Sequence, residues 1–191
     1  TEYAFVPLDE NMLIRTFKVK NNSKNDVNVS LLAYSKLLTN INNDSCGLVK
    51  NDTLVQYNHD YAVCTFAKEA LDSYQINGVD SSFPSGNIGG KDYVGMSPES
   101  GIKYNLEIFK PGEEKIINLC ILVNDNSKKN LLSDLDNEII RIRKKDIKKE
   151  LEKTEKYWKK YLKDHDKLNL NKKSNISQKV KNLYNRTILL F

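Results

Sequence analysis

The sequence predicts a mainly β antiparallel sandwich followed by two or three α-helices. Residues 3–124 alternate between short β-type runs and polar turns, a density of strands typical of antiparallel sandwiches. After residues 124–127 the hydrophobic period changes from two residues to the helical spacing. The charge changes in the same region, since residues 1–127 carry 11 Lys and Arg against 16 Asp and Glu, whereas residues 128–191 carry 19 against 9.

Alternating apolar residues bounded by polar turns define the predicted strands, which are residues 13–21, 27–38, 53–57, 61–67, 102–109 and 115–123. Polar residues 58–60 predict a hairpin between the third and fourth of these strands. Pro111 and Gly112 predict a tight turn between the last two. The segment 81–101 is rich in Ser, Gly and Pro, which predicts a long surface loop.

Helical spacing of apolar residues predicts three helices in the last third of the chain. The first contains Leu131, Leu132, Leu135, Ile139 and Ile142. The second begins near residues 144–146 and carries one apolar and aromatic face, formed by Ile147, Leu151, Trp158, Tyr161 and Leu162. A polar linker at 169–173 follows. Ser174 or Asn175 is then predicted to cap the third helix, whose stripe contains Ile176, Val180, Leu183, Thr187 and Leu190.

Composition excludes two classes of partner. No apolar run approaches the ~20 residues of a membrane span, so no membrane partner is expected. The basic residues of the last third are interleaved with Glu and Asp and accompany no nucleic-acid-binding motif. We therefore interpret them as a solvated helix surface and expect no nucleic-acid partner.

Three cysteines, Cys46, Cys64 and Cys120, occur without close pairs. Cys64 and Cys120 lie in apolar runs and are predicted to be buried thiols, although a disulfide stays open. Unpaired thiols favour a cytoplasmic location slightly over a secreted one. We expect no metal site and no cofactor, because the chain has no Cys-x-x-Cys motif and only two histidines, His59 and His165.

The sequence singles out no catalytic residue. No nucleophile accompanies His59 and Asp60, and no pair of carboxylates stands in a context that marks it as an acid and a base. A sugar-stacking platform is one interpretation of the strand tyrosines Tyr57, Tyr61, Tyr74, Tyr93 and Tyr104. Ordinary half-buried strand residues are the favoured interpretation.

Three segments resemble one enzyme family. They are residues 13–23 (LIRTFKVKNNS), residues 154–162 (TEKYWKKYL) and residues 180–190 (VKNLYNRTILL), of which the two helical motifs, 154–162 and 180–190, are the most specific. In this order they resemble the bacterial and archaeal glucoamylase-like enzymes of glycoside hydrolase family 15. The resemblance implies a β-supersandwich joined by a helical linker to an (α/α) six-fold barrel that hydrolyses α-glucosidic bonds in starch-type glucans.

On this resemblance the chain divides into a partial sandwich at 1–126, a helical linker at 127–173 and the truncated start of the barrel at 174–191. The start at Thr1 and the apolar end at Phe191 fit a fragment of a larger protein. The family's two catalytic glutamates lie downstream of Phe191. The resemblance therefore implies no catalytic residue here and predicts that this fragment by itself is inactive.

The implied partner is the catalytic helical barrel of the same parent chain, with an α-glucan as a further ligand and self-association through the C-terminal helix as another outcome. The predicted domain-interface residues are Trp158, Tyr161, Leu162, Leu183, Tyr184 and Arg186. Two alternatives stay open. The chain could be a carbohydrate-binding β-sandwich module, or the N-terminal region of a glycoside phosphorylase, which resembles the same arrangement.

Overall fold

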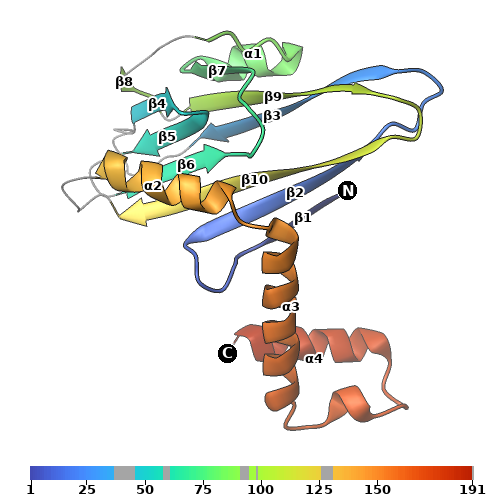
Figure 1. The fold of residues 1–191 in the computed structure, drawn as a ribbon. Coiled ribbons are helices and arrows are strands. Elements are labelled where there is room, and N and C mark those ends of the chain that lie inside the picture. The colour runs from blue at the N-terminus through green and yellow to red at the C-terminus, as the bar shows by residue number, and fades with distance from the viewer. Residues whose placement is uncertain (37–45, 58–60, 91–94, 98, 126–130, 191) are drawn as a thin grey trace. The chain divides into compact units, whose positions relative to one another are not determined.

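A computed structural model describes residues 1–36, 46–57, 61–90, 95–97, 99–125 and 131–190 (Figure 1). The chain forms two compact units, Thr1–Lys145 and Asp146–Phe191, which are described separately. The first unit contains two antiparallel sheets in a sandwich-like arrangement, and helices follow the strands. The predicted fold class is therefore confirmed.

The larger sheet of the first unit, sheet A, has seven strands in the order β1-β2-β10-β6-β5-β4-β8. These strands are β1 (Glu2–Phe5), β2 (Met12–Lys20), β4 (Cys46–Lys50), β5 (Thr53–Tyr57), β6 (Tyr61–Phe66), β8 (Gly95–Met96) and β10 (Glu114–Asp125). Strands β5 and β6 pair antiparallel as predicted, with Leu54 opposite Thr65, while the turn residues 58–60 lie outside the described part of the chain.

The smaller sheet, sheet B, has three strands in the order β3-β9-β7. These strands are β3 (Val27–Lys36), β9 (Glu99–Phe109) and β7 (Ser73–Ile76). The predicted turn after β9 is present, since the Glu113 amide donates to the Lys110 carbonyl at 2.9 Å and Gly112 takes a φ of +79°. This turn carries the chain from sheet B to sheet A, so the two strands it joins belong to different sheets.

The main core lies between the two sheets. Side chains at alternate positions of facing strands point into this layer because successive residues of a strand point to opposite faces. Its buried members are Leu54, Ala67, Ile76, Ile102, Tyr104, Leu106, Phe109, Ile117 and Leu119. The strand predictions for β9 and β10 rested on alternating apolar residues. These apolar residues form the inward face of the sandwich.

Helix α2 (Leu131–Arg143) lies against the other face of sheet A (Figure 1). On that face Ile14, Cys120 and Phe66 are neighbours across three strands, and all three are buried. The helix contributes its own buried residues, Leu135, Ile139 and Ile142. Lys50 from β4 forms an ion pair of 2.6 Å with Asp136 of the helix. The apolar residues whose helical spacing predicted this helix are therefore the ones that pack on the sheet.

The segment predicted as a long surface loop, residues 81–101, is partly ordered structure instead. The short helix α1 (Val79–Ser82) and the 3-10 turn η1 (Phe83–Ser85) come first, and residues 99–101 belong to β9. Val79 and Ile88 are buried, and a Cβ atom added at Gly101 would lie 2.9 Å from Val79 Cγ1. The prediction was wrong here because Ile88 inside the Ser- and Gly-rich segment, and Val79 just before it, pack close to Gly101.

The second unit contains α3 (Ile147–Asp164), the 3-10 turn η2 (Leu170–Lys172) and α4 (Gln178–Leu190). The Asp146 carboxylate caps α3 by accepting hydrogen bonds from the Lys148 and Lys149 amides. The predicted cap of the last helix was wrong by two or three residues. Ser177 takes this position, since its hydroxyl accepts from the Val180 amide at 3.4 Å.

Candidate functional site

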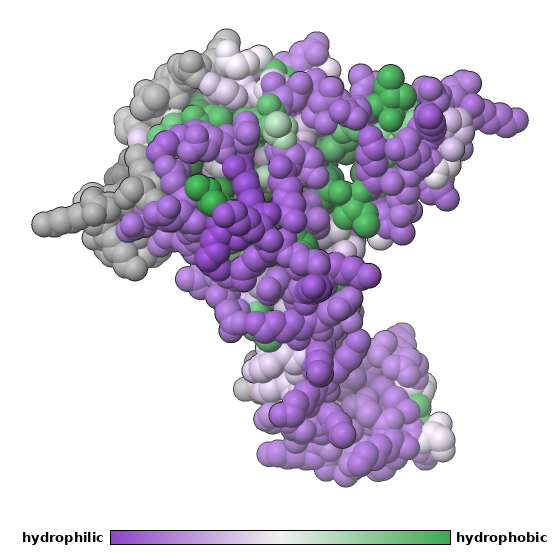
Figure 2. Space-filling model, viewed as in Figure 1, coloured by the Kyte–Doolittle hydropathy of each residue, from purple (hydrophilic) through white to green (hydrophobic). Residues whose placement is uncertain are grey.

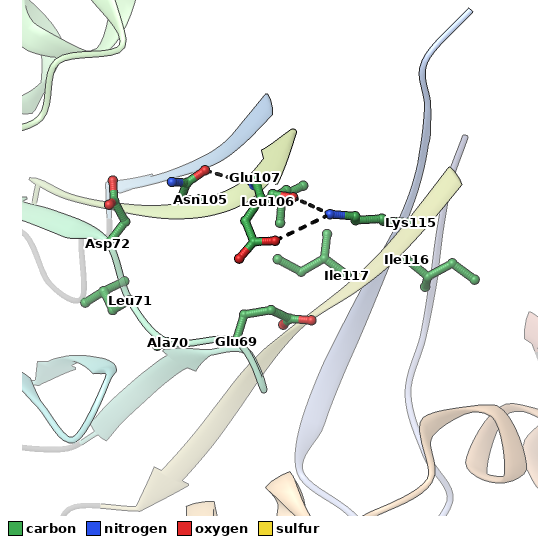
Figure 3. Close-up of a pocket in the computed structure, with 10 residues that line it drawn as sticks. All are labelled: Glu69, Ala70, Leu71, Asp72, Asn105, Leu106, Glu107, Lys115, Ile116 and Ile117. Atoms are coloured by element: carbon green, nitrogen blue, oxygen red, sulfur yellow. Dashed lines mark hydrogen bonds and ion pairs between the residues drawn. The ribbon is translucent and has the colours of Figure 1, made fainter. Parts of the chain in front are cut away.

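A pocket opens in the first unit where the chain crosses from sheet A to sheet B (Figure 3). Its volume is about 520 Å³, which lies in the range of small-molecule sites. Three separate segments line it, residues 69–72 of the β6–β7 connection, residues 105–107 of β9 and residues 115–117 of β10. Leucine, isoleucine and alanine side chains share this lining with carboxylates, an amide and one amine.

Lys115 extends from β10 toward β9 (Figure 3). Its ammonium donates a hydrogen bond of 2.8 Å to the Leu106 carbonyl and lies 3.9 Å from the Glu107 carboxylate. It also lies 4.8 Å from the centre of the buried Phe109 ring. These contacts hold the amine between the two sheets, so the pocket presents a fixed positive charge next to its carboxylates.

Glu69 supplies the least satisfied group of the pocket. Its Oε2 atom is buried and has no hydrogen-bond partner among the described residues. Asp72, on the same connection, lies 3.8 Å from the Lys103 ammonium. Because a buried acceptor without a donor costs free energy, this oxygen lowers the stability of the first unit beside the pocket. The carboxylates, the amide and the amine of the lining can form hydrogen bonds with a small polar ligand.

Glu107 lies at a β-bulge beside Lys115. Ile108 pairs with Asn28 and Asn105 pairs with Ser30, so two residues of β9 oppose one residue of β3. Glu107 takes a φ of +64°, a conformation that glycine adopts without steric cost. The Asn105 side-chain oxygen accepts from the Glu107 amide at 2.9 Å and supports this turn of the backbone.

Replacing Glu107 by glycine is expected to raise the free energy of unfolding by about 1 kcal/mol, because the left-handed conformation no longer crowds a Cβ atom. Urea unfolding followed by circular dichroism measures this change. Glu107→Gln is the matched control, since it removes the charge, keeps the strained backbone and should leave stability almost unchanged. A glycine variant that is less stable than the parent would show that the contact with Lys115 outweighs the strain.

Two of the predicted interface residues of α3, Trp158 and Tyr161, belong to one aromatic cluster. The Trp158 ring packs edge-on against Tyr157 and Tyr161, with centroids 5.1 and 5.5 Å away. Tyr161 stacks on His165 at 4.0 Å, at the end of the helix. Trp158 remains 41% exposed, while Tyr161 and Leu162 are half-buried. The cluster therefore leaves aromatic surface open to a partner.

The predicted interface residues of α4 separate onto different sides of that helix. Tyr184 faces the segment just before η2, because its hydroxyl accepts from the Leu168 amide at 3.3 Å. Asn185, the next residue, binds the Asn171 side chain on the same side. Leu183 is 66% exposed and Arg186 is also exposed. Tyr184 therefore makes contacts within the second unit, whereas Leu183 and Arg186 lie at the surface of that unit.

The strand tyrosines do not form one platform. Tyr104 is fully buried in the core between the sheets, where no sugar ring can reach it. Tyr61 is exposed at the start of β6, and Tyr57 and Tyr74 are half-buried on different sheets. Tyr93 lies outside the described residues. Successive residues of a strand point to opposite faces, so some of these tyrosines are buried or half-buried and do not share one exposed surface.

Cys64 and Cys120 are free, buried thiols. Burial raises the pKa of each to about 12, so both are protonated at neutral pH. Within the described ranges, no group of three His, Cys, Asp or Glu side chains could hold a metal ion. None of the helices that the structure describes has the length and apolar character that a membrane crossing requires.

The pocket was not found from the sequence. Its lining comes from residues up to 48 positions apart, and no motif marks any of the three segments. The positive φ of Glu107 carries no sequence signal either, because glycine is the residue expected at such a bulge. No model of a known protein family matches the sequence, and no curated protein matches it.

Proposed function

We propose that this chain is the non-catalytic N-terminal sandwich and linker region of a glucoamylase-like enzyme that hydrolyses α-glucosidic bonds in starch-type glucans. One observation carries the proposal. The two most specific motifs of the family resemblance, residues 154–162 and 180–190, lie on two successive helices that follow an antiparallel sandwich. This order is the one that the resemblance implies for a linker helix and the first barrel helix.

The exposed faces of these helices support the same role. A structural region of a larger enzyme has to present apolar surface to the domain that it supports. Trp158 on α3 and Leu183 on α4 are large apolar side chains exposed by 41% and 66%. In the proposed function they contact the catalytic barrel, which supplies the acid and the base for hydrolysis. Self-association through α4 stays a second outcome for the isolated chain.

Hydrolysis and binding assays on the same preparation test this proposal. We expect the chain alone to release no glucose from maltoheptaose and to give no heat of binding in calorimetric titration. Adding it to a family 15 barrel expressed without its own sandwich should raise the melting temperature of that barrel. Glucose release by the chain alone would contradict the proposal, and so would a barrel whose stability is unchanged.

A carbohydrate-binding module is the second candidate, favoured by the pocket. Its carboxylates and amide are acceptors suited to sugar hydroxyl groups. Binding of maltoheptaose with a dissociation constant of roughly 1 mM or lower would favour this candidate. Glu69→Gln should then weaken binding, whereas Glu2→Gln, a change of an exposed glutamate that does not line the pocket, should not.

A further inference from the structure

Helix α4 carries an outward stripe of exposed side chains. Val180, Leu183 and Thr187 follow the spacing that places residues on one side of a helix. Val180 is 47% exposed and Leu183 is 66% exposed. The neighbouring side of α4 is already occupied, because Tyr184 binds the Leu168 amide and Lys181 donates to the Asn171 carbonyl at 3.2 Å. The stripe is therefore a part of α4 that is open to a partner.

The charge of α4 indicates which kind of partner its stripe would bind. Lys179 and Arg186 lie next to the stripe, and the helix contains no Asp or Glu. No acidic residue occurs anywhere after Asp166 in the sequence. An anionic partner would gain Coulomb energy at this surface, whereas a basic one would be repelled. A second copy of α4 would place like charges together, so charge disfavours pairing of two such helices.

We propose that the outward stripe of α4 docks an amphipathic helix whose apolar ridge is flanked by Asp and Glu. Apolar residues at helical spacing form a ridge that fits the groove of another helix. A lipid surface fits less well, because the stripe is narrow and the neighbouring side of α4 is held by η2. That the partner helix belongs to the catalytic barrel rests on the proposed function. That the stripe binds an acidic amphipathic helix does not.

The test uses the full chain and two fluorescent helical peptides with the same leucine ridge, one flanked by glutamate and one by lysine. We expect the acidic peptide to bind, and the basic peptide to bind at least about tenfold more weakly at low salt. Leu183→Gln should weaken acidic-peptide binding about tenfold. Leu189→Gln is the matched control, because Leu189 is an exposed leucine of the same helix (45%) that lies on a different side of α4.

Several results would overturn the inference. Equal binding of the two peptides would show that charge does not select the partner. Equal effects of the Leu183 and Leu189 substitutions would show that the peptide does not bind at the stripe. Tighter binding to vesicles of anionic phospholipid than to the acidic peptide would assign the stripe to a membrane. A dimer in light scattering that Leu183→Gln dissociates would assign it to a second copy. None of these results depends on whether the chain supports a glucan hydrolase.

Discussion

Replacing Arg143 by alanine is expected to lower the free energy of unfolding of the first unit by about 3 kcal/mol, the largest effect that we predict. Arg143 ends α2 and donates to the carbonyls of Asn51 and Asp52 at 2.9 Å each. It also donates to the Ala67 carbonyl at 3.2 Å. Its guanidinium thus joins the helix to the β4–β5 turn and to the end of β6.

The shape of the guanidinium matters as well as its charge. Arg143 also donates to the Thr53 hydroxyl at 3.2 Å and lies 5.4 Å from the centre of the Phe66 ring. A planar group with several N–H donors can serve these acceptors together while it stacks on the ring. A lysine has one ammonium and cannot reproduce that arrangement. Arg143→Lys should therefore recover less than half of the lost stability.

Urea unfolding at pH 7 measures these changes. Circular dichroism is the suitable signal, because the single tryptophan, Trp158, belongs to the second unit and does not report on the sheets. Lys144→Ala, a change of the exposed neighbour, is the control and should shift stability by less than about 0.5 kcal/mol. A loss below 1 kcal/mol for Arg143→Ala would mean that water satisfies the four acceptors equally well.

The first unit is also expected to lose stability steeply in acid because of Glu10. The Glu10 carboxylate is only 4% exposed and accepts two hydrogen bonds from Arg141, at 2.6 and 2.7 Å. Lys145 forms a second ion pair with it at 2.5 Å. Hydrogen bonding to the Arg141 guanidinium, together with Lys145, lowers the pKa of Glu10 from 4.5 to about 2.

The direction of the pH effect follows from that lowered pKa. Between pH 4.5 and pH 2 the unfolded chain binds a proton at Glu10 more readily than the folded chain does. The stability from this carboxylate is therefore complete above pH 4.5 and is lost as the pH falls toward 2. The shift corresponds to about 3 kcal/mol, which we lower to about 2 because Arg141 is 50% exposed to solvent.

A comparison of the parent chain with Glu10→Gln isolates this contribution. The difference in unfolding free energy between the two should be about 2 kcal/mol at pH 7 and should shrink toward zero near pH 2. Glu2→Gln is the control, since Glu2 binds Arg15 at 2.6 Å but both side chains are more than 40% exposed. Such a surface pair contributes at most about 1 kcal/mol. A Glu10 difference that does not change with pH would exclude the carboxylate as the cause.

The candidate interface residues illustrate what local pattern can predict about a site. Trp158, Tyr161 and Leu162 recur at helical spacing, and the structure places them on α3 with aromatic surface still exposed. The pocket shows the opposite case. Glu69, Glu107 and Lys115 lie on three segments that meet only because two sheets pack together, so no short stretch of sequence contains the arrangement.

Strand alternation, helical spacing and turn residues were sufficient to predict the elements, because each reflects which side of a short segment is buried. Strands β2, β5, β9 and β10 and helix α2 lie where these patterns predicted them. The division of strands between two sheets was decided only by the tertiary structure. Only four residues, 110–113, separate Phe109 from Glu114, yet their strands pair in different sheets. Strand pairing depends on hydrogen bonds between residues far apart in the sequence, and the same long-range packing placed Arg143 against Asn51 and Glu10 against Arg141.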